Sequence, residues 1–519
     1  MPERGLVLVG ASGSGKTTLG RLMADRLGRR LIDTDALIEA RTGLPPHEHL
    51  RRGGEAEFRQ FEADAISEAC AHHGAIIATG GGAVLDPLNR WALWHHGTVA
   101  WLDAPAEVLV GRLEADGVER PLARPYRSET LEAMLAARLP FYRAADHRLD
   151  ATADPEALVG QLVAMVERQT PISRRLFDAE IDRHHPVGPP RTRVVMGLDL
   201  ETPGLDGVVI IDRRLAHAGP PILANAPCLA IAGGEGAKRL HRLGEILEWL
   251  AGQRVERGTT LVAIGGGTIG DLAGTAAALF ARGLPLVQVP TTWLAQADSA
   301  IGGKVAIDLR AAKNSAGAFW PPVEIISDVV ALRSLPLRHR REGMAESIKS
   351  ALIGDPGLWS LLESRGAASL RHDEAARYAI IERSARLKLD VCARDPFEAG
   401  ERRTLNLGHT IGHALEIASG YRLAHGSAVA LGLRAVAAIT TGRGVDRDLA
   451  PRLDALLDAL GFQLRLAFDD SAVRAALRGD KKRAGNRQRW ILPMAVGRVV
   501  EVDDVTAAGL TRALRAIAA

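Results

Sequence analysis

A glycine-rich loop directly after a short apolar run constrains the fold of this 519-residue chain more than any other feature. Residues 10–17 read GASGSGKT, which matches the pattern GxxxxGK[ST]; an apolar run precedes them and an amphipathic stretch follows. Between a strand and a helix, this pattern forms a P-loop whose backbone N–H groups converge on phosphate oxygens. Lys16 would neutralise β- and γ-phosphate charge, and Thr17 would offer a hydroxyl to Mg²⁺.

The remainder of residues 1–166 has the rhythm of an α/β domain, in which helices cover both faces of a parallel sheet. Short apolar runs at 6–9, 76–78 and 99–102 alternate with amphipathic stretches. Asp33 and Asp35 follow a further run, so we expect them at the carboxyl edge of the sheet, where ligands bind. Either aspartate alone could instead cap a helix. Residues 80–82 are three glycines after a strand, which permit close backbone approach to a ligand or make an ordinary turn.

The chain divides again further on. Residues 167–193 lose hydrophobic periodicity and contain several prolines, so we interpret them as a linker. Residues 194–327 alternate strands and helices and are expected to form a second α/β lobe. Residues 328–519 show mainly helical periodicity and are expected to form a mostly helical lobe.

A second glycine loop lies in the second α/β lobe. Residues 261–271 read LVAIGGGTIGD, so three glycines follow an apolar run and open a helix. This context favours a dinucleotide pyrophosphate at the helix N-terminus, although the spacing differs from GxGxxG. Upstream, residues 233–238 read GGEGAK and could contact the ribose or adenine; a surface loop is the alternative.

A possible metal site lies in the helical lobe. His409 and His413 are four positions apart on one helical face, His425 follows, and Glu346 belongs to another predicted helix. A lone HxxxH pair is more often structural. Together these residues could offer two imidazoles and one carboxylate to zinc, with open positions for a substrate.

Basic residues gather between the glycine loop and the histidines. A single one is usually a solvated charge, but several beside glycine turns or on site-facing helices indicate an anionic substrate. A substrate that carries both a phosphate and a carboxylate would suit these basic residues. They are Arg282, Lys304, Lys313, Lys349, Lys388 and Arg402.

Composition excludes several classes of protein. The net charge is +3 and aromatic residues are only 4%, so the basic footprint and stacking platforms of a nucleic-acid binder are missing. The longest uncharged stretch, residues 215–234, contains three prolines, so we expect no membrane span. The first apolar run is too short for a signal peptide, and three scattered cysteines suit a reducing cytoplasm.

Residues 1–165 resemble the shikimate kinase family. The resemblance rests on the P-loop, the DTD pair, the EFRxxE helix at 57–62, the three glycines, Arg120 and Arg138. It implies transfer of a phosphoryl group from ATP to shikimate, with Asp35 assisting the attacking hydroxyl and Arg120 on a lid. The implied ATP site is Gly13, Ser14, Gly15, Lys16, Thr17, Thr18 and Arg120, with Mg²⁺ at Thr17. The implied shikimate site is Asp35, Arg59, Gly81 and Arg138.

Residues 230–500 resemble the 3-dehydroquinate synthase family. The motifs include GGGxxGD, VPTT, DSxxGGK, AExIK and NxGHxxxH. The resemblance implies NAD- and metal-dependent conversion of 3-deoxy-D-arabino-heptulosonate 7-phosphate to 3-dehydroquinate with phosphate release. It also implies a homodimer formed through this part, and zinc or cobalt held by Glu346, His409 and His425.

The same resemblance supplies the remaining site residues. The implied NAD contacts are Gly234, Glu235, Lys238, Gly266, Gly267, Thr268, Ile269, Gly270, Asp271, Thr291, Thr292, Lys304 and Lys313. The implied substrate and catalytic residues are Arg282, Asp298, Lys304, Asn314, Lys349, Lys388, Arg402, Asn406, His413, Lys481 and Lys482. One departure concerns Ser427, where the family usually has glutamate in an HGE motif. It could change the support of the metal-binding histidine.

Two alternatives stand beside a bifunctional shikimate-pathway enzyme. The first part could be a catalytically silent nucleotide-binding module fused to a related sugar-phosphate cyclase, or the second part could be a metal-dependent polyol dehydrogenase. The full set of kinase residues argues against the silent module. The phosphate-directed lysines argue against the dehydrogenase, which net NADH production from a polyol would support.

Overall fold

The computed structural model describes residues 4–116, 128–167, 174–182, 189–200, 207–216, 226–310, 312–440, 444–478, 483–484 and 487–519. The chain forms two compact units, Met1–Glu180 with Val194–Glu201, and Ile181–Arg193 with Thr202–Ala519. Within the described residues, no helix combines the length and apolar character that crossing a bilayer requires.

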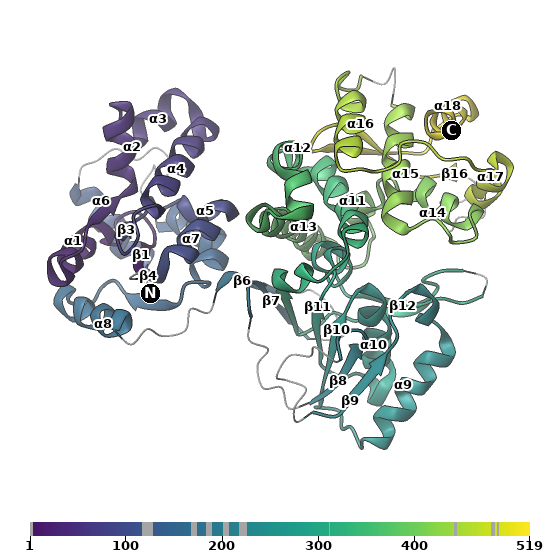
Figure 1. Ribbon diagram of the computed structural model, residues 1–519, viewed down its shortest axis with the longest axis horizontal. Helices are drawn as coiled ribbons and strands as arrows, with labels where there is room; N and C mark the ends of the chain where they lie inside the picture. Colours follow the sequence, from purple (N-terminus) through teal and green to yellow (C-terminus); the bar gives the residue numbers. More distant parts are fainter. Residues whose placement is uncertain are drawn as a thin grey trace. The chain divides into compact units, whose positions relative to one another are not determined.

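The first unit is built on a five-stranded parallel sheet with helices around it (Figure 1). The sheet order is β2 (Leu31–Asp33), β3 (Ile76–Ala78), β1 (Gly5–Val9), β4 (Gly97–Asp103) and β5 (His147–Asp150). The central strand β1 is buried along its whole length, which explains its unbroken apolar sequence. The surrounding helices are α1 (Lys16–Leu27), α2 (Thr34–Thr42), α3 (Pro46–Arg52), α4 (Gly54–Cys70), η1 (Ala83–Leu85), α5 (Pro87–His96), α6 (Ala106–Asp116), α7 (Ser128–Tyr142) and α8 (Pro155–Glu167).

The segment that we interpreted as a linker, residues 167–193, contains a strand, β6 (Arg175–Asp182). Leu176 and Phe177 are buried, and the Phe177 ring lies 5.8 Å from that of Phe141 in α7. Arg90 of α5 donates to the carbonyl of Leu176 at 2.8 Å and lies over the Phe141 ring. This strand was not predicted, because the apolar stretch is too short and too closely flanked by charges to show a period.

Phe177→Ala is expected to destabilise the first unit by about 3 kcal/mol, the usual cost of removing a buried phenylalanine side chain. The measurement is urea unfolding of the full chain, in which the loss of kinase activity and the loss of synthase activity are each monitored against urea concentration. Arg174→Ala, which breaks only an exposed ion pair with Asp199, is the control and should change stability by less than about 1 kcal/mol. A similar, small effect of Phe177→Ala would contradict the packing role.

A seven-stranded sheet follows in the order β6, β7 (Arg191–Gly197), β14 (Glu324–Asp328), β11 (Leu286–Pro290), β10 (Thr260–Gly265), β8 (Gly207–Asp212) and β9 (Cys228–Ile231). The pairs from β9 to β14 are parallel. Helices α9 (Leu240–Gly252) and α10 (Gly267–Leu279) pack in the core of this lobe through Leu243, Ile246 and Leu272. Smaller elements are η4 (Glu235–Ala237), η5 (Phe280–Arg282), η6 (Ala295–Ser299), β12 (Lys304–Ile307), β13 (Ala316–Phe319) and η7 (Val329–Arg333).

The remainder is mostly helical, as the periodicity predicts, so the expected fold class is confirmed. α15 (His425–Ile439) is buried over nearly its full length. The other helices of this part are α11 (Leu337–Gly354), α12 (Pro356–Arg371), α13 (Glu374–Arg394), η8 (Glu401–Asn406), α14 (His409–Ala418), α16 (Leu449–Ala459), α17 (Asp470–Arg478) and α18 (Ala507–Ile517), of which α11, α14, α16 and α18 pack against α15. Two short hairpins pair β15 (Arg483–Ala484) with β16 (Arg487–Gln488) and β17 (Trp490–Ala495) with β18 (Arg498–Val502).

Candidate active sites

The glycine-rich loop at residues 10–17 has the conformation of a phosphate cradle. Gly13 and Gly15 have φ values of 82° and 89°, in the left-handed region that favours glycine. The buried Lys16 Nζ donates to the carbonyl oxygens of Gly10 at 2.9 Å and Ala11 at 2.7 Å. Residues 13–18 thus form the loop and the first turn of α1, whose N-terminus can receive an anion.

Asp33 connects this loop to the next strand. Its Oδ2 accepts from Thr17 Oγ1 at 2.6 Å, and its Oδ1 accepts from the backbone N–H groups of Asp35 and Ala36. The simpler alternative, a helix cap, therefore applies to Asp33, which is the N-cap of α2. Its second oxygen also places a carboxylate beside the hydroxyl that we expect to bind Mg²⁺.

The three glycines at 80–82 lie tightly among predicted site residues. A Cβ added to Gly80 would lie 2.7 Å from Asp35 Oδ1, and one added to Gly82 would lie 2.5 Å from Arg59 Nη1. A Cβ at Gly81 would lie 3.0 Å from the backbone N of Ser12 in the phosphate loop. Any side chain here would occupy the space between the phosphate loop, the carboxylate and the guanidinium.

Arg138 also reaches these glycines. Its Nη1 donates to the carbonyl oxygen of Gly81 at 2.9 Å, and Tyr142 donates to the same oxygen at 2.8 Å. The structure thus brings together Asp35, Arg59, Gly81 and Arg138, the four predicted shikimate-binding residues. Arg120, predicted for a lid over ATP, lies outside the described residues.

Two residues that we did not predict, Glu62 and Tyr142, support the predicted shikimate site. Glu62 is buried and its Oε2 accepts from Arg59 Nη1 at 2.6 Å. Burial raises the pKa of Glu62, and the charge of Arg59 opposes that shift. Glu62 is three positions after Arg59 and Tyr142 is four after Arg138, so helical spacing from a predicted residue could have identified both.

The second glycine loop also has the expected form. Gly266 is the N-cap of α10, and a Cβ at Gly266 would lie 3.0 Å from Thr292 Cγ2. A Cβ at Gly267 would lie 2.8 Å from Ser299 Oγ. Thr291 donates its backbone N–H to the carbonyl oxygen of Gly265. The N-terminus of α10 thus lies against both the VPTT loop and η6. The space at Gly266 and Gly267 is too small for larger side chains.

The upstream residues lie against the same helix. Lys238 Nζ is 2.5 Å from Asp271 Oδ2 and donates to Asn314 Oδ1. Burial raises the pKa of Asp271 to about 6, although Lys238 acts in the opposite direction. Lys313 lies 3.5 Å from Glu235 and 3.7 Å from Glu416. Among the residues predicted for a dinucleotide, Lys238 thus pairs with Asp271, and Lys313 pairs with Glu235.

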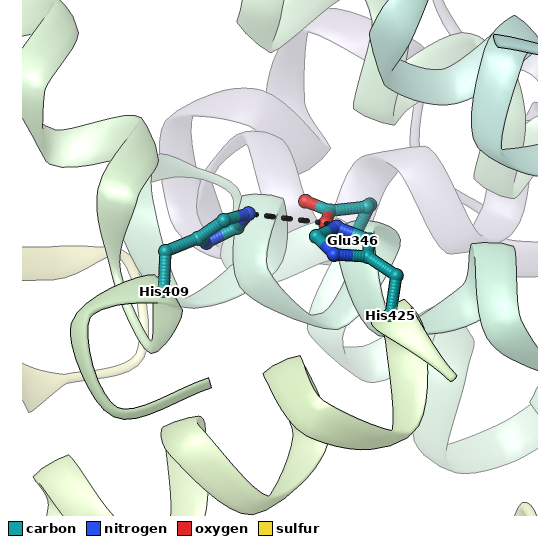
Figure 2. Close-up of side chains that lie close together, drawn as sticks. All are labelled: Glu346, His409 and His425. Atoms are coloured by element: carbon teal, nitrogen blue, oxygen red, sulfur yellow. Dashed lines mark hydrogen bonds and ion pairs between the residues drawn. The ribbon is translucent and has the colours of Figure 1, made fainter. Parts of the chain in front are cut away.

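The three predicted metal ligands converge (Figure 2). Ligand atoms of Glu346, His409 and His425 all lie within 4.8 Å of one another. Glu346 Oε1 is 3.1 Å from His425 Nε2 and 3.4 Å from His409 Nε2. The opposite nitrogens are occupied, since His409 Nδ1 lies 3.1 Å from the carbonyl of Leu407 and His425 Nδ1 lies 3.3 Å from Glu416 Oε1. Such partners orient metal-binding imidazoles.

The electrostatics of this cluster favour positive charge beside Glu346. Burial acts to raise the pKa of Glu346, but Lys349 and the two histidines hold it well below its usual range. Burial acts to lower the pKa of His425, yet hydrogen bonds with Glu346 and Glu416 raise it to about 10. Two imidazoles and one buried carboxylate suit Zn²⁺ or Co²⁺, which would take the place of the proton.

Predicted substrate residues extend from this cluster. Lys349 forms an ion pair with Glu346 and lies 3.6 Å from Asp298 Oδ1. Lys388 Nζ lies 3.0 Å from the same oxygen. Burial acts to raise the pKa of Asp298, but these two ammonium groups lower it. The His413 ring lies 5.3 Å from that of His409, which places it beside the proposed metal.

A second group of substrate residues centres on Glu398, which we did not predict. Lys304 Nζ lies 2.5 Å from Glu398 Oε2, and Asn406 donates to Glu398 Oε1 at 2.7 Å. Buried Arg402 donates to the carbonyl of Gly302 at 2.8 Å. Glu398 lies in the loop after α13, outside any motif, so only the tertiary structure identifies it.

The structure does not bring every predicted residue into these groups. Arg282 lies exposed at the end of η5, outside the contacts described above. Lys481 and Lys482 lie outside the described residues.

Fold and site together define a class of protein: a P-loop phosphotransferase and a metal-dependent α/β enzyme for anionic substrates, joined in one chain. Family models agree with that division. The shikimate kinase model matches residues 12–167, and the N-terminal and C-terminal 3-dehydroquinate synthase models match residues 228–342 and 343–483.

Relatives of the second part are similar over most of their length. The chain is 42% identical to a 3-dehydroquinate synthase from Paracoccus denitrificans over 56% of this chain and 81% of that protein. It is 40% identical to one from Symbiobacterium thermophilum, covering 56% and 82%. The chain therefore belongs to the 3-dehydroquinate synthase family, and a shikimate kinase domain precedes the synthase part.

A solved structure of related fold supports the architecture of the synthase part. A 2-epi-5-epi-valiolone synthase from Streptomyces hygroscopicus subsp. jinggangensis 5008, with NAD⁺ and Zn²⁺ bound, matches with a TM-score of 0.60 and 27% identity. The match covers 64% of this chain and 98% of the other. A 2-deoxy-scyllo-inosose synthase shares the fold with a TM-score of 0.57.

Proposed function

We propose that the chain is a bifunctional enzyme of the shikimate pathway. One activity phosphorylates shikimate with ATP to give shikimate 3-phosphate. The other converts 3-deoxy-D-arabino-heptulosonate 7-phosphate to 3-dehydroquinate and releases phosphate. The observation that carries the proposal is the presence, in one chain that matches both families, of two clustered sites built from the residues that each chemistry needs.

In the kinase site, Asp35 orients the shikimate hydroxyl and accepts its proton as the phosphoryl group is transferred. Arg59 and Arg138 bind the substrate carboxylate, because planar guanidinium groups suit a planar anion. Lys16, the loop N–H groups and Arg120 stabilise phosphate charge, and Thr17 helps to bind Mg²⁺. Support comes from the contacts of the three glycines with Asp35, Arg59 and the phosphate loop.

In the synthase site, Glu346, His409 and His425 would hold Zn²⁺ or Co²⁺, and the loop around Gly266, Gly267 and Asp271 would bind NAD. When bound, the metal supplies Lewis acidity at a substrate hydroxyl and NAD supplies a temporary hydride acceptor. His413 would exchange a proton beside the metal. Lys304, Lys349, Lys388 and Arg402, with Asn314 and Asn406, would orient the anionic substrate and stabilise the leaving phosphate.

Further assignments complete the proposal. Residues 1–166 would form the kinase domain, 194–327 the NAD-binding lobe and 328–519 the metal and substrate lobe, with residues 167–193, including β6, between them. A homodimer through the synthase part and a cytoplasmic location would fit this activity. Small molecules are the partners that the two domain families act on.

A paired assay on purified full-length protein tests the proposal. We expect ADP to form from ATP only when shikimate is present, and inorganic phosphate to be released from the heptulosonate phosphate. Metal content measured on the same preparation should be about one zinc or cobalt per chain. A folded protein inert with shikimate would refute the kinase assignment. Net NADH production from a polyol would favour a dehydrogenase over the synthase.

A further inference from the structure

A carboxylate on α11 closes the first turn of α15, the helix that begins at His425. Glu342 Oε2 accepts from the backbone N–H of Ser427 at 2.8 Å, and its Oε1 accepts from the Ser427 hydroxyl at 2.7 Å. The α15 N-cap, Ala424, provides no side-chain acceptor of its own. Glu342 therefore does for α15 what a capping side chain does for most helices.

The two helices touch at this point. A Cβ added to Gly426 would overlap the backbone carbonyl of Glu342, so only glycine allows α15 to approach α11 so closely. A carboxylate at a helix N-terminus is also favoured by the helix dipole and by the unpaired N–H groups of the first turn. Sterics and electrostatics therefore both hold Ser427 against Glu342.

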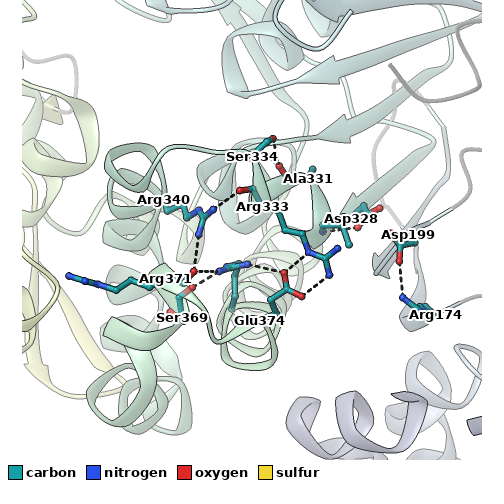
Figure 3. Close-up of polar contacts among 12 residues, drawn as sticks. Arg174, Asp199, Asp328, Ala331, Arg333, Ser334, Arg340, Ser369, Arg371 and Glu374 are labelled. Atoms are coloured by element: carbon teal, nitrogen blue, oxygen red, sulfur yellow. Dashed lines mark hydrogen bonds and ion pairs between the residues drawn. The ribbon is translucent and has the colours of Figure 1, made fainter. Parts of the chain in front are cut away.

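The helix that carries Glu342 is itself well anchored (Figure 3). Arg340 donates to the carbonyl oxygens of Arg333 at 2.8 Å and Leu370 at 2.9 Å, which ties α11 to η7 and to the end of α12. Arg333 forms a two-pronged ion pair with Glu374 at the start of α13. Because α11 is held in place by these contacts, the Glu342 carboxylate on it can fix the position of α15.

The position of the contact relates it to the metal ligands. Glu342 is one helical turn before Glu346 on α11, and Ser427 is two residues after His425 on α15. The contact thus joins the two helices that supply one carboxylate and one imidazole, which lie 3.1 Å apart. It also gives Ser427, where the resemblance leads us to expect glutamate, a carboxylate partner from another helix.

We propose that Glu342 is a positioning residue that sets the distance between Glu346 and His425 through its two hydrogen bonds with Ser427, and thereby strengthens metal binding. The inference rests on the metal site of the proposed function. Neither Glu342 nor Ser427 is a proposed metal ligand, so the effect is indirect. Groups that hydrogen-bond directly to metal ligands typically change metal affinity by about 10- to 100-fold, so an indirect effect belongs at the lower end of that range.

The test measures the Zn²⁺ dissociation constant of metal-stripped full-length protein by competition with a chromophoric chelator. Glu342→Ala is expected to weaken binding about 10-fold, the lower end of the range for groups that support metal ligands. Ser427→Ala should weaken it only about threefold, because the backbone N–H remains. The double variant should be no weaker than Glu342→Ala, since the hydroxyl then has no acceptor to lose. Glu342→Gln, which retains an acceptor oxygen, should recover part of the affinity.

Matched measurements separate positioning from general loss of structure. Glu363→Gln removes an exposed carboxylate of α12 that pairs with Arg452 and should leave the dissociation constant unchanged. Urea unfolding of every variant reports on the integrity of the second unit, to which Glu342 and Ser427 belong, and kinase activity checks the protein concentration. The Co²⁺-loaded protein should show a shifted visible spectrum in Glu342→Ala, because ligand geometry changes.

Two outcomes would overturn the inference in distinguishable ways. Wild-type protein that binds no metal would refute the metal site and the inference together. Wild-type affinity and an unchanged Co²⁺ spectrum in Glu342→Ala and Ser427→Ala would refute the positioning role alone. If Glu342→Ala does not fold, Ser427→Ala and Glu342→Gln decide the question.

Discussion

Replacing Asp35 by asparagine is expected to lower the kcat of shikimate phosphorylation by about 10³-fold, because the amide cannot accept the proton of the attacking hydroxyl. Asparagine has nearly the same volume as aspartate, so the close fit of Asp35 against Gly80 should survive. Shikimate binding should change much less than kcat, since Arg59 and Arg138 remain. The measurement is ADP formation with ATP saturating and shikimate varied.

The full chain supplies the controls for that variant. Phosphate release by the synthase should be unaffected, which shows that the second unit is folded and the protein is correctly quantified, and urea unfolding reports on the first unit, which holds Asp35. Asp64→Asn changes an exposed carboxylate on α4 and should leave the kinase unaltered. A kcat for Asp35→Asn within tenfold of wild type would show that another group accepts the proton.

His409→Ala is expected to reduce synthase activity by about 10³-fold, corresponding to the several kcal/mol that a Lewis-acidic metal contributes. The variant removes one of two imidazoles beside Glu346 and leaves a carboxylate and one histidine, too few for a stable catalytic zinc site. A zinc-selective chelator should have the same effect on the wild type, and added Zn²⁺ or Co²⁺ should restore activity.

The measurement is phosphate release together with the metal content of each sample. Mg²⁺ kept in excess should preserve kinase activity throughout the chelation experiment. His241→Ala, an exposed histidine on α9, is the matched control and should retain both activity and metal. Synthase activity that survives chelation with no metal detected would contradict the metal assignment.

Much of the fold and of both sites could be predicted because the informative residues are close in sequence. The phosphate loop needs a strand, a turn and a helix in succession, so residues 10–17 predict their own structure. Gly266 opens α10 for the same reason. Helical spacing likewise put His409 and His413 on one face of α14, and their rings lie 5.3 Å apart.

Other parts of the sites could not be predicted, because their partners meet only across the fold. Glu398 approaches Lys304 from 94 positions away, and Glu342 lies 85 positions from Ser427. Local patterns carry no information about such pairs. The strand β6 was missed for a related reason, since its buried face depends on Arg90 and Phe141 of helices far earlier in the chain.

By itself, the amino-acid sequence determined the chemistry that is available: which groups could hold phosphate, which could bind a dinucleotide and which could ligate a metal. The reason is that donor types and their local spacing follow directly from residue identity and helix or strand geometry. Only the tertiary structure decided how these groups are supported. Tertiary packing buries the carboxylate of Glu62 beside Arg59 and brings Glu342 to Ser427. It also brings Glu416 within hydrogen-bond distance of His425. These contacts fix one geometry among the many that the same residues could adopt.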